Sequence, residues 1–240
     1  MGYIPPAMSI SIQTFLGPET DDLNHRFVHA FADLGFSVEL HPESVLTESP
    51  PVGALYLKIT GTPSRICRLE PDVPLLVAFG YGVSHSRRRR QKQRARLGGK
   101  SPCSYVAGSR TSAGRSPAAG AMQMLAMAVL AKETGGYLYA DGYEVSVKGD
   151  TAVELAMQEL AHFEKFNFDA YAHRFESWPP LDKDLPFTWP PEIVPPVTPA
   201  QIPVKAKRKL STLFGYKFSW LHLPGIFFFI YFLVVTILYS

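Results

Sequence analysis

The sequence has few cysteines and no leader-like N-terminus. Cys67 and Cys103 are the two cysteines among 240 residues. They do not imply a disulfide framework, and we expect both to be reduced thiols in a reducing compartment. Residues 1–8 lack a basic start followed by a long apolar run. We therefore expect no secretory signal peptide.

Acidic residues are missing from two stretches of the chain. Residues 87–100 hold eight Lys or Arg and no acid, and residues 205–217 hold five and no acid. Of the 24 basic residues, thirteen thus lie in these stretches, which leaves eleven against 21 acidic residues. The rest of the chain is therefore acidic, although the formal net charge of the whole chain is +3. Because nucleic-acid-binding domains carry a basic face, we expect nucleic acid not to be a partner.

Catalytic motifs are also missing. The sequence contains no Gly-x-Ser-x-Gly elbow and no His-Glu-x-x-His pattern. His25 and His29 are spaced to share a metal on one face of a helix, and they are weak candidate ligands. The same spacing also fits the solvated face of an amphipathic helix, which we favour. We expect no cofactor, no metal and no enzymatic activity.

The end of the sequence is strongly apolar. Residues 223–240 contain no charge, and a helix over them would span roughly 27 Å at 1.5 Å per residue. Since the hydrocarbon core of a bilayer is about 30 Å thick, we predict one transmembrane helix over residues 218–240.

The charges beside this helix predict its orientation. Five cations precede it and none follows it: Lys205, Lys207, Arg208, Lys209 and Lys217. Positive flanks stay on the cytoplasmic side of a membrane. We expect a single-pass protein whose N-terminal domain faces the cytoplasm.

A proline-rich spacer, residues 177–217, should join the domain to the anchor and includes the basic neck. Residues 177–203 hold nine of the chain's 21 prolines, which favours extended polyproline II. The alternative is that the spacer folds back onto the domain, as aromatic side chains in a spacer often do. Three aromatic residues in this stretch favour it: Trp178, Phe187 and Trp189. Both outcomes remain open from the sequence.

Residues 1–176 show the periodicities of an α+β domain. Alternating or continuous apolar runs predict strands, and apolar stripes predict helices. We expect helix starts at Thr20, Ser116 and Thr151 and helix stops at Gly35 and Gly135. The strands are expected at 10–16, 36–40, 55–59, 73–79, 103–107, 137–140 and 143–147, and the helices at 20–34, 116–135 and 151–166. This order predicts a mostly antiparallel sheet with helices on one face, as a ferredoxin-like variant.

One glycine-containing stretch is a candidate anion site. Gly108, Arg110, Gly114, Arg115 and Ser116 lie between a predicted strand and a predicted helix. A phosphate-binding loop has four residues between its glycines and then Lys, whereas five residues intervene here and Arg replaces Lys. The free amide groups of the helix N-terminus make weak anion binding the candidate role of this stretch.

The basic segment of residues 87–100 allows three interpretations. It is a solvated hairpin tip, a contact for anionic lipid, or a contact for an acidic partner, nucleic acid or targeting receptor. Its cations are Arg87, Arg88, Arg89, Arg90, Lys92, Arg94, Arg96 and Lys100. We expect the basic neck to contact the same bilayer.

These observations predict a membrane-tethered, non-catalytic domain that binds a protein partner in the cytoplasm. An adaptor and a toxin-neutralising immunity protein both fit this pattern. The alternative is an enzyme or anionic-ligand-binding domain that uses the stretch from Gly108 to Ser116.

Overall fold

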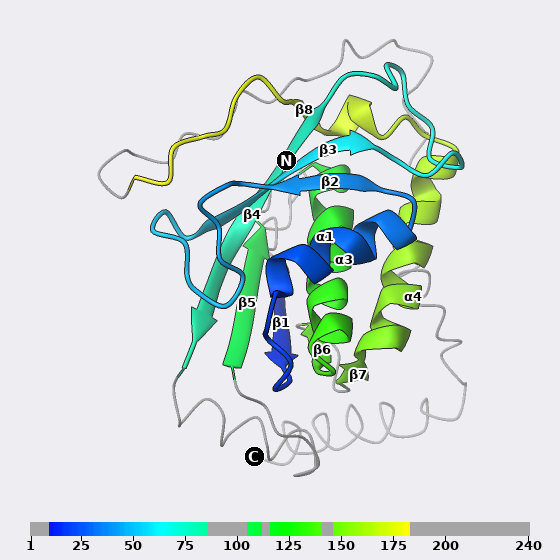
Figure 1. The fold of residues 1–240 in the computed structure, drawn as a ribbon. Coiled ribbons are helices and arrows are strands. Elements are labelled where there is room, and N and C mark those ends of the chain that lie inside the picture. The colour runs from blue at the N-terminus through cyan, green and yellow to red at the C-terminus, as the bar shows by residue number, and fades with distance from the viewer. Residues whose placement is uncertain (1–9, 86–104, 112–115, 141–145, 183–240) are drawn as a thin grey trace, which may run out of the picture. The chain divides into compact units, whose positions relative to one another are not determined.

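The computed structural model describes residues 10–85, 105–111, 116–140 and 146–182. They form an α+β structure with an antiparallel sheet and three α-helices, as the periodicity predicts (Figure 1). The predicted transmembrane helix, 218–240, lies outside these residues.

Eight strands make up the sheet, in the order β2-β3-β4-β5-β1-β6-β7, with β8 paired to β4. Each of the described strand pairs is antiparallel. The strands are β1 (Ile10–Leu16), β2 (Ser37–Leu40), β3 (Ala54–Gly61), β4 (Leu75–Ser84), β5 (Tyr105–Thr111), β6 (Tyr137–Ala140), β7 (Val147–Lys148) and β8 (His173–Arg174).

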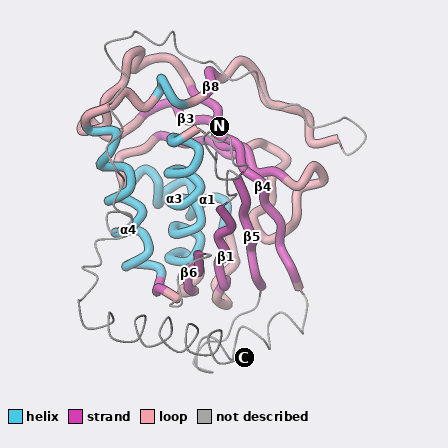
Figure 2. The backbone as a smooth tube through the Cα atoms, turned by 180° about the vertical axis from the view of Figure 1, so that it is seen from behind, coloured by secondary structure: helices cyan, strands magenta, loops and turns pink. Residues whose placement is uncertain are grey.

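Helix α3 (Pro117–Glu133) is the central helix. It packs against α1 (Leu23–Asp33) and α4 (Gly149–Leu160), and it contacts β1, β4, β5 and β6 (Figures 1 and 2). Two short 3-10 helices, η1 (Ala161–Glu164) and η2 (Asp169–Tyr171), follow α4. Because α3 is enclosed by the sheet and two helices, it is apolar nearly all round and buries eleven of its residues.

The buried polar groups of α3 are hydrogen-bonded to the sheet. Gln123 Nε2 donates to Ser109 Oγ at 2.9 Å, and Thr111 Oγ1 donates to Gln123 Oε1 at 2.9 Å. Thr14 Oγ1 donates to the carbonyl oxygen of Met127 at 2.8 Å. These bonds offset the desolvation of buried polar groups and identify the face of β1 and β5 that α3 covers.

Two glycines end helices where the sequence predicts. Gly35 has φ +85° after α1, and the amide of Phe36 donates to the Phe31 carbonyl at 2.9 Å. The Phe31 and Phe36 rings meet edge-on at 6.1 Å, which is the apolar contact of a Schellman motif. Gly135, with φ +64°, ends α3 in the same way. Both predicted stops are confirmed.

The predicted N-caps of the first and last helices are wrong. Helix α1 begins after Asp22, which has φ +50° and makes no side-chain cap, and not after Thr20. Helix α4 begins at Gly149, two residues before Thr151. A Cβ at Gly149 would lie 2.3 Å from Lys132 Cα, so the first residue of α4 packs against the end of α3 too closely for any residue but glycine.

Substitution of Phe27 tests this core. Its ring is fully buried, 4.9 Å from the Phe31 ring, so Phe27→Ala should lower the free energy of unfolding by about 3–5 kcal/mol. The exposed pair on the opposite side of α1 is the control, and His25→Ala with His29→Ala should cost little. Urea unfolding of a chain ending at residue 217 measures both. A loss of stability on chelation in the parent, absent from the double variant, would instead establish a metal site.

Candidate binding site

The face of the sheet away from the helices carries a second apolar cluster. Ser109 faces α3, so its neighbour Arg110 faces away, and so do the cross-strand partners Gly80 and Ala54. We call this side the distal face. Its buried cluster comprises Ala54, Tyr56, Leu76, Ala78 and Leu181.

Leu181 belongs to a segment that follows β8, residues 175–182, which we call the strap. It starts at a hydrogen bond from the Phe175 amide to the Pro74 carbonyl, 2.9 Å long. Phe175 and Trp178 pack against the distal-face cluster, and their rings meet edge-on at 5.0 Å. The strap is thus held to the sheet by apolar and aromatic contacts. Fold-back is confirmed for Trp178; Phe187 and Trp189 lie outside the described residues.

The loop that joins β2 to β3, residues 41–53, is held at several points. Asn24 of α1 donates to the Ser44 carbonyl at 2.6 Å and accepts from the Leu46 amide at 3.0 Å. Tyr81 Oη donates to the Leu46 carbonyl at 2.5 Å. The Val83 amide donates to Ser49 Oγ at 2.7 Å. Contacts with both α1 and β4 therefore position this loop beside the strap.

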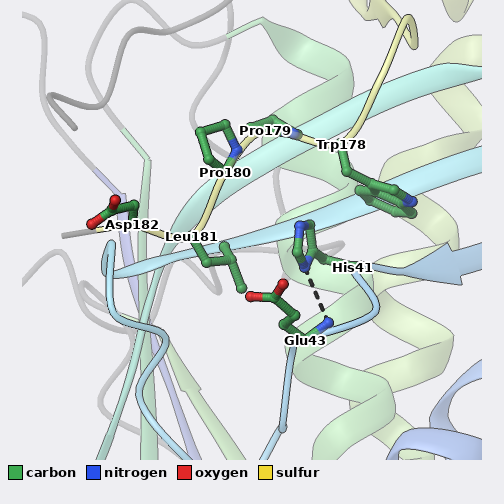
Figure 3. A pocket seen from close by; sticks show the side chains of 7 residues that line it. All are labelled: His41, Glu43, Trp178, Pro179, Pro180, Leu181 and Asp182. Carbon is green, nitrogen blue, oxygen red and sulfur yellow. Dashed lines mark hydrogen bonds between the residues drawn. The ribbon is translucent and has the colours of Figure 1, made fainter. Parts of the chain in front are cut away.

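A pocket of about 440 Å³ lies where the loop meets the strap (Figure 3). It is lined by His41, Glu43, Trp178, Pro179, Pro180, Leu181 and Asp182. The lining contains two exposed carboxylates and no Lys or Arg. The two sides of the pocket come from segments far apart in the sequence.

His41 is the buried polar group of this pocket, with 6% of its surface exposed. Its ring meets the Trp178 ring edge-on at 5.2 Å. Its Nδ1 accepts from the Glu43 amide at 3.2 Å, so the neutral ring carries its proton on Nε2. Within the described part of the chain, Nε2 makes no hydrogen bond. In Figure 3 this nitrogen is turned away from Glu43.

Burial changes the acidity of two tyrosines near the site. Tyr56 lies in the distal-face cluster with the strap, and burial raises its pKa to about 12. Burial also raises the pKa of Tyr81, which lies on the other face of the sheet and bonds to the 41–53 loop. Desolvation disfavours the charged phenolate in both cases.

The predicted anion-site residues lie on two elements. Gly108 and Arg110 are inside β5, where Gly108 pairs with Gln13 of β1 and Gly82 of β4. Ser116 is the N-cap of α3, and its Oγ accepts from the Ala119 amide at 3.2 Å. Gly114 and Arg115 lie outside the described residues. The strand therefore extends further toward α3 than the glycine pattern suggests.

The other predicted residues fall on exposed or undescribed parts. His25 and His29 are exposed on α1, and His29 Nδ1 lies 3.5 Å from an Asp33 carboxylate oxygen. No cluster of three metal-ligating side chains occurs among the described residues.

The basic segment connects two paired strands. Ser84 of β4 pairs with Val106 of β5, so the strands on either side of this segment form an antiparallel pair. The cations at 87–90, 92, 94 and 96 lie outside the described residues, as do those at 205 and 207–209. No helix in the described ranges is long and apolar enough to cross a membrane.

Sequence reasoning missed His41, Glu43 and Asp182. The one signal of the site was Trp178, an aromatic residue in a proline-rich stretch. Comparisons with protein-family models, curated proteins and solved structures gave no match.

The pKa of Tyr56 should report whether the strap is docked. Trp178→Ala combined with Leu181→Ala removes apolar cover from Tyr56, so its pKa should fall from about 12 toward 10. Titration of the tyrosine ring carbons by NMR measures this, with Tyr56→Phe giving the assignment. Tyr81 is the internal control, because it lies on the other face and should keep its raised pKa. An unchanged pKa at Tyr56 would show that the strap does not cover it.

Proposed function

We propose that the chain is a membrane-tethered, non-catalytic protein-binding domain that faces the cytoplasm, of the adaptor or toxin-immunity type. The observation that carries this proposal is the pocket between the 41–53 loop and the strap (Figure 3). Its loop side is held by backbone and side-chain hydrogen bonds, and its strap side by aromatic packing. A preformed, open site of this kind suits recognition of a partner's side chains.

The position of the pocket in the chain supports a link between binding and tethering. The strap includes the first residues of the proline-rich spacer and continues into residues 183–217, so a partner bound at Trp178 would be held next to the tether. The predicted anchor and the neck cations at 205 and 207–209 would keep this assembly at the bilayer. We propose that the basic segment between β4 and β5 adds an electrostatic contact with anionic lipid.

The strand order supports a ferredoxin-like variant as the structural core. The central strands run β6-β1-β5-β4, all antiparallel, with α1 after β1 and α3 between β5 and β6. In this proposal β2 and β3 are an inserted hairpin. The pocket then belongs to the inserted hairpin and the strap, both outside that core.

The alternative, an anionic ligand at the stretch from Gly108 to Ser116, has less support. Gly108 lies within the ladder between β1 and β4, and the Ser116 hydroxyl caps α3. Pro117 further removes one amide donor from the helix N-terminus. The pocket beside the strap is therefore our preferred site.

Deletion of residues 218–240 tests the tether. The full chain should fractionate with membranes, and the shortened chain should be soluble with an unchanged cooperative melt, because the spacer separates the predicted anchor from the core. Membrane flotation and circular dichroism measure the two properties. Aggregation or loss of the cooperative melt would show that the apolar segment belongs to the fold.

Site-specific photocrosslinking tests the binding site. A photoreactive amino acid replaces Glu43 at the pocket in the full-length chain in its own membranes, and Glu154, exposed on α4, is the matched control position. We expect one discrete protein adduct from position 43 and none of the same mass from position 154. Equal adducts at both positions, or none at position 43, would contradict the proposal.

A further inference from the structure

We propose that the chain beyond the strap continues along the distal face and lays two aromatic side chains, Phe187 and Trp189, on a floor of two strand glycines, Gly82 and Gly108. This inference goes beyond the proposed function and does not depend on any partner. It rests on the two glycines, on the direction of the strap and on the apolar pattern of the residues that follow it.

The two glycines form a bare patch on the distal face. Gly108 is next to Ser109, whose hydroxyl accepts from Gln123 of α3 at 2.9 Å, so Gly108 faces away from the helices. Gly82 is its cross-strand partner on β4 and therefore lies on the same face. Gln13 of β1 pairs with Gly108 on its other side. The floor is thus part of a row that crosses three neighbouring strands.

Neither the backbone nor the packing of the described residues requires glycine at these positions. Neither residue has a positive φ, and the register between β4 and β5 is continuous. A Cβ built on Gly108 would have the Gly82 carbonyl oxygen, at 3.9 Å, as its nearest described neighbour. A Cβ built on Gly82 would lie at an ordinary 3.5 Å from Ser49 Oγ. Because a glycine inside a strand often marks the close approach of another group, the floor is expected to be covered.

An aromatic side chain suits this floor, and the sequence places two directly after the strap. A ring that packs over a strand glycine restores the cover that the missing side chain does not give. Leu185, Phe187 and Trp189 alternate with polar or proline residues, which is the pattern of an extended segment with one buried face. Prolines follow Leu185 and Trp189 and favour an extended backbone at both.

The direction of the strap brings this segment toward the floor. The Phe175 ring lies 5.0 Å from Lys58 Nζ, at the level of Leu76 in β4. Trp178 packs against His41, at a level two residues further along β4. The strap therefore runs toward the carboxyl end of β4, where the floor lies.

The chain is long enough to reach the floor. Gly82 lies four residues beyond Ala78, which shares a cluster with Leu181, and this is roughly 14 Å at 3.4 Å per strand residue. Phe187 follows Leu181 by six residues, which span roughly 19 Å in extended polyproline II. Docking of the segment would shorten the free spacer to residues 190–217.

The test uses the full chain in nanodiscs that hold one chain each, with ¹³C-labelled glycine. Gly82→Ala and Gly108→Ala assign the two floor resonances. A ring over a glycine moves its Hα resonances upfield, so we expect this shift at one or both glycines of the parent. It should be lost when Phe187 and Trp189 are both changed to Leu. Phe166→Leu is the matched control, because it removes an exposed ring elsewhere and should leave the shift unchanged.

A second measurement follows the docked segment itself. Chymotrypsin can cut after Phe187, which no proline follows, and the rate reports how often the segment is free. Gly108→Val fills the floor with a residue that strands favour, so the rate should rise several-fold while the cooperative melt is kept. Ser37→Val, at an exposed position of β2, should leave the rate unchanged.

Three results would overturn the inference. The first is a glycine shift that survives the loss of both rings, which would mean that another group covers the floor. The second is no upfield shift in discs with one chain and a shift in discs with two, which would identify a second copy as the cover. The third is an equal rate of cleavage after Phe187 in the parent and in a folded Gly108→Val variant.

Discussion

Docking of the strap against the distal face is the interaction on which the proposed site depends. Without Leu181 and Trp178 on the sheet, the pocket would lose five of its seven lining residues. Small side chains make the docking possible, because Ala54 and Ala78 leave room beside Tyr56 for the strap to approach. The same contact determines where the chain leaves the domain toward the spacer. Under the proposed function, the binding surface and the start of the spacer would therefore share one structural element.

The energetics of this contact differ from those of the helical core. Full burial of a leucine side chain stabilises by about 1.5–3 kcal/mol, and the strap has one described backbone hydrogen bond, at Phe175. The core between α3 and the sheet combines many buried side chains with the hydrogen bonds of Gln123. Local opening of the strap should thus cost less than global unfolding. A ligand that contacts both the strap and the 41–53 loop would stabilise the docked form by linkage.

Much of the fold could be predicted because its signals are local. The stripe of Phe27 and Phe31, the Ser116 cap and the stops at Gly35 and Gly135 each depend on a few neighbouring residues. The predicted cap at Thr151 failed where α4 starts at Gly149, which packs closely against Lys132, and the predicted cap at Thr20 failed because α1 begins after Asp22.

The pocket could not be predicted in the same way. His41 and Asp182 meet only because the sheet brings the hairpin loop and the strap together. Neither residue belongs to a motif. Trp178 in a proline-rich stretch indicated a segment that docks on the domain. The surface on which it docks depends on the β3–β4 pairing, which periodicity alone does not predict.

The most direct measurement of the docked strap is the nuclear Overhauser effect between the Trp178 indole protons and the His41 ring protons in the full-length chain. The rings are 5.2 Å apart and edge-on, so the account predicts a clear cross-peak, together with an indole resonance shifted from its random-coil position. Both should disappear when Leu181 is changed to Ala. A random-coil indole resonance without the cross-peak in the parent chain would contradict the account.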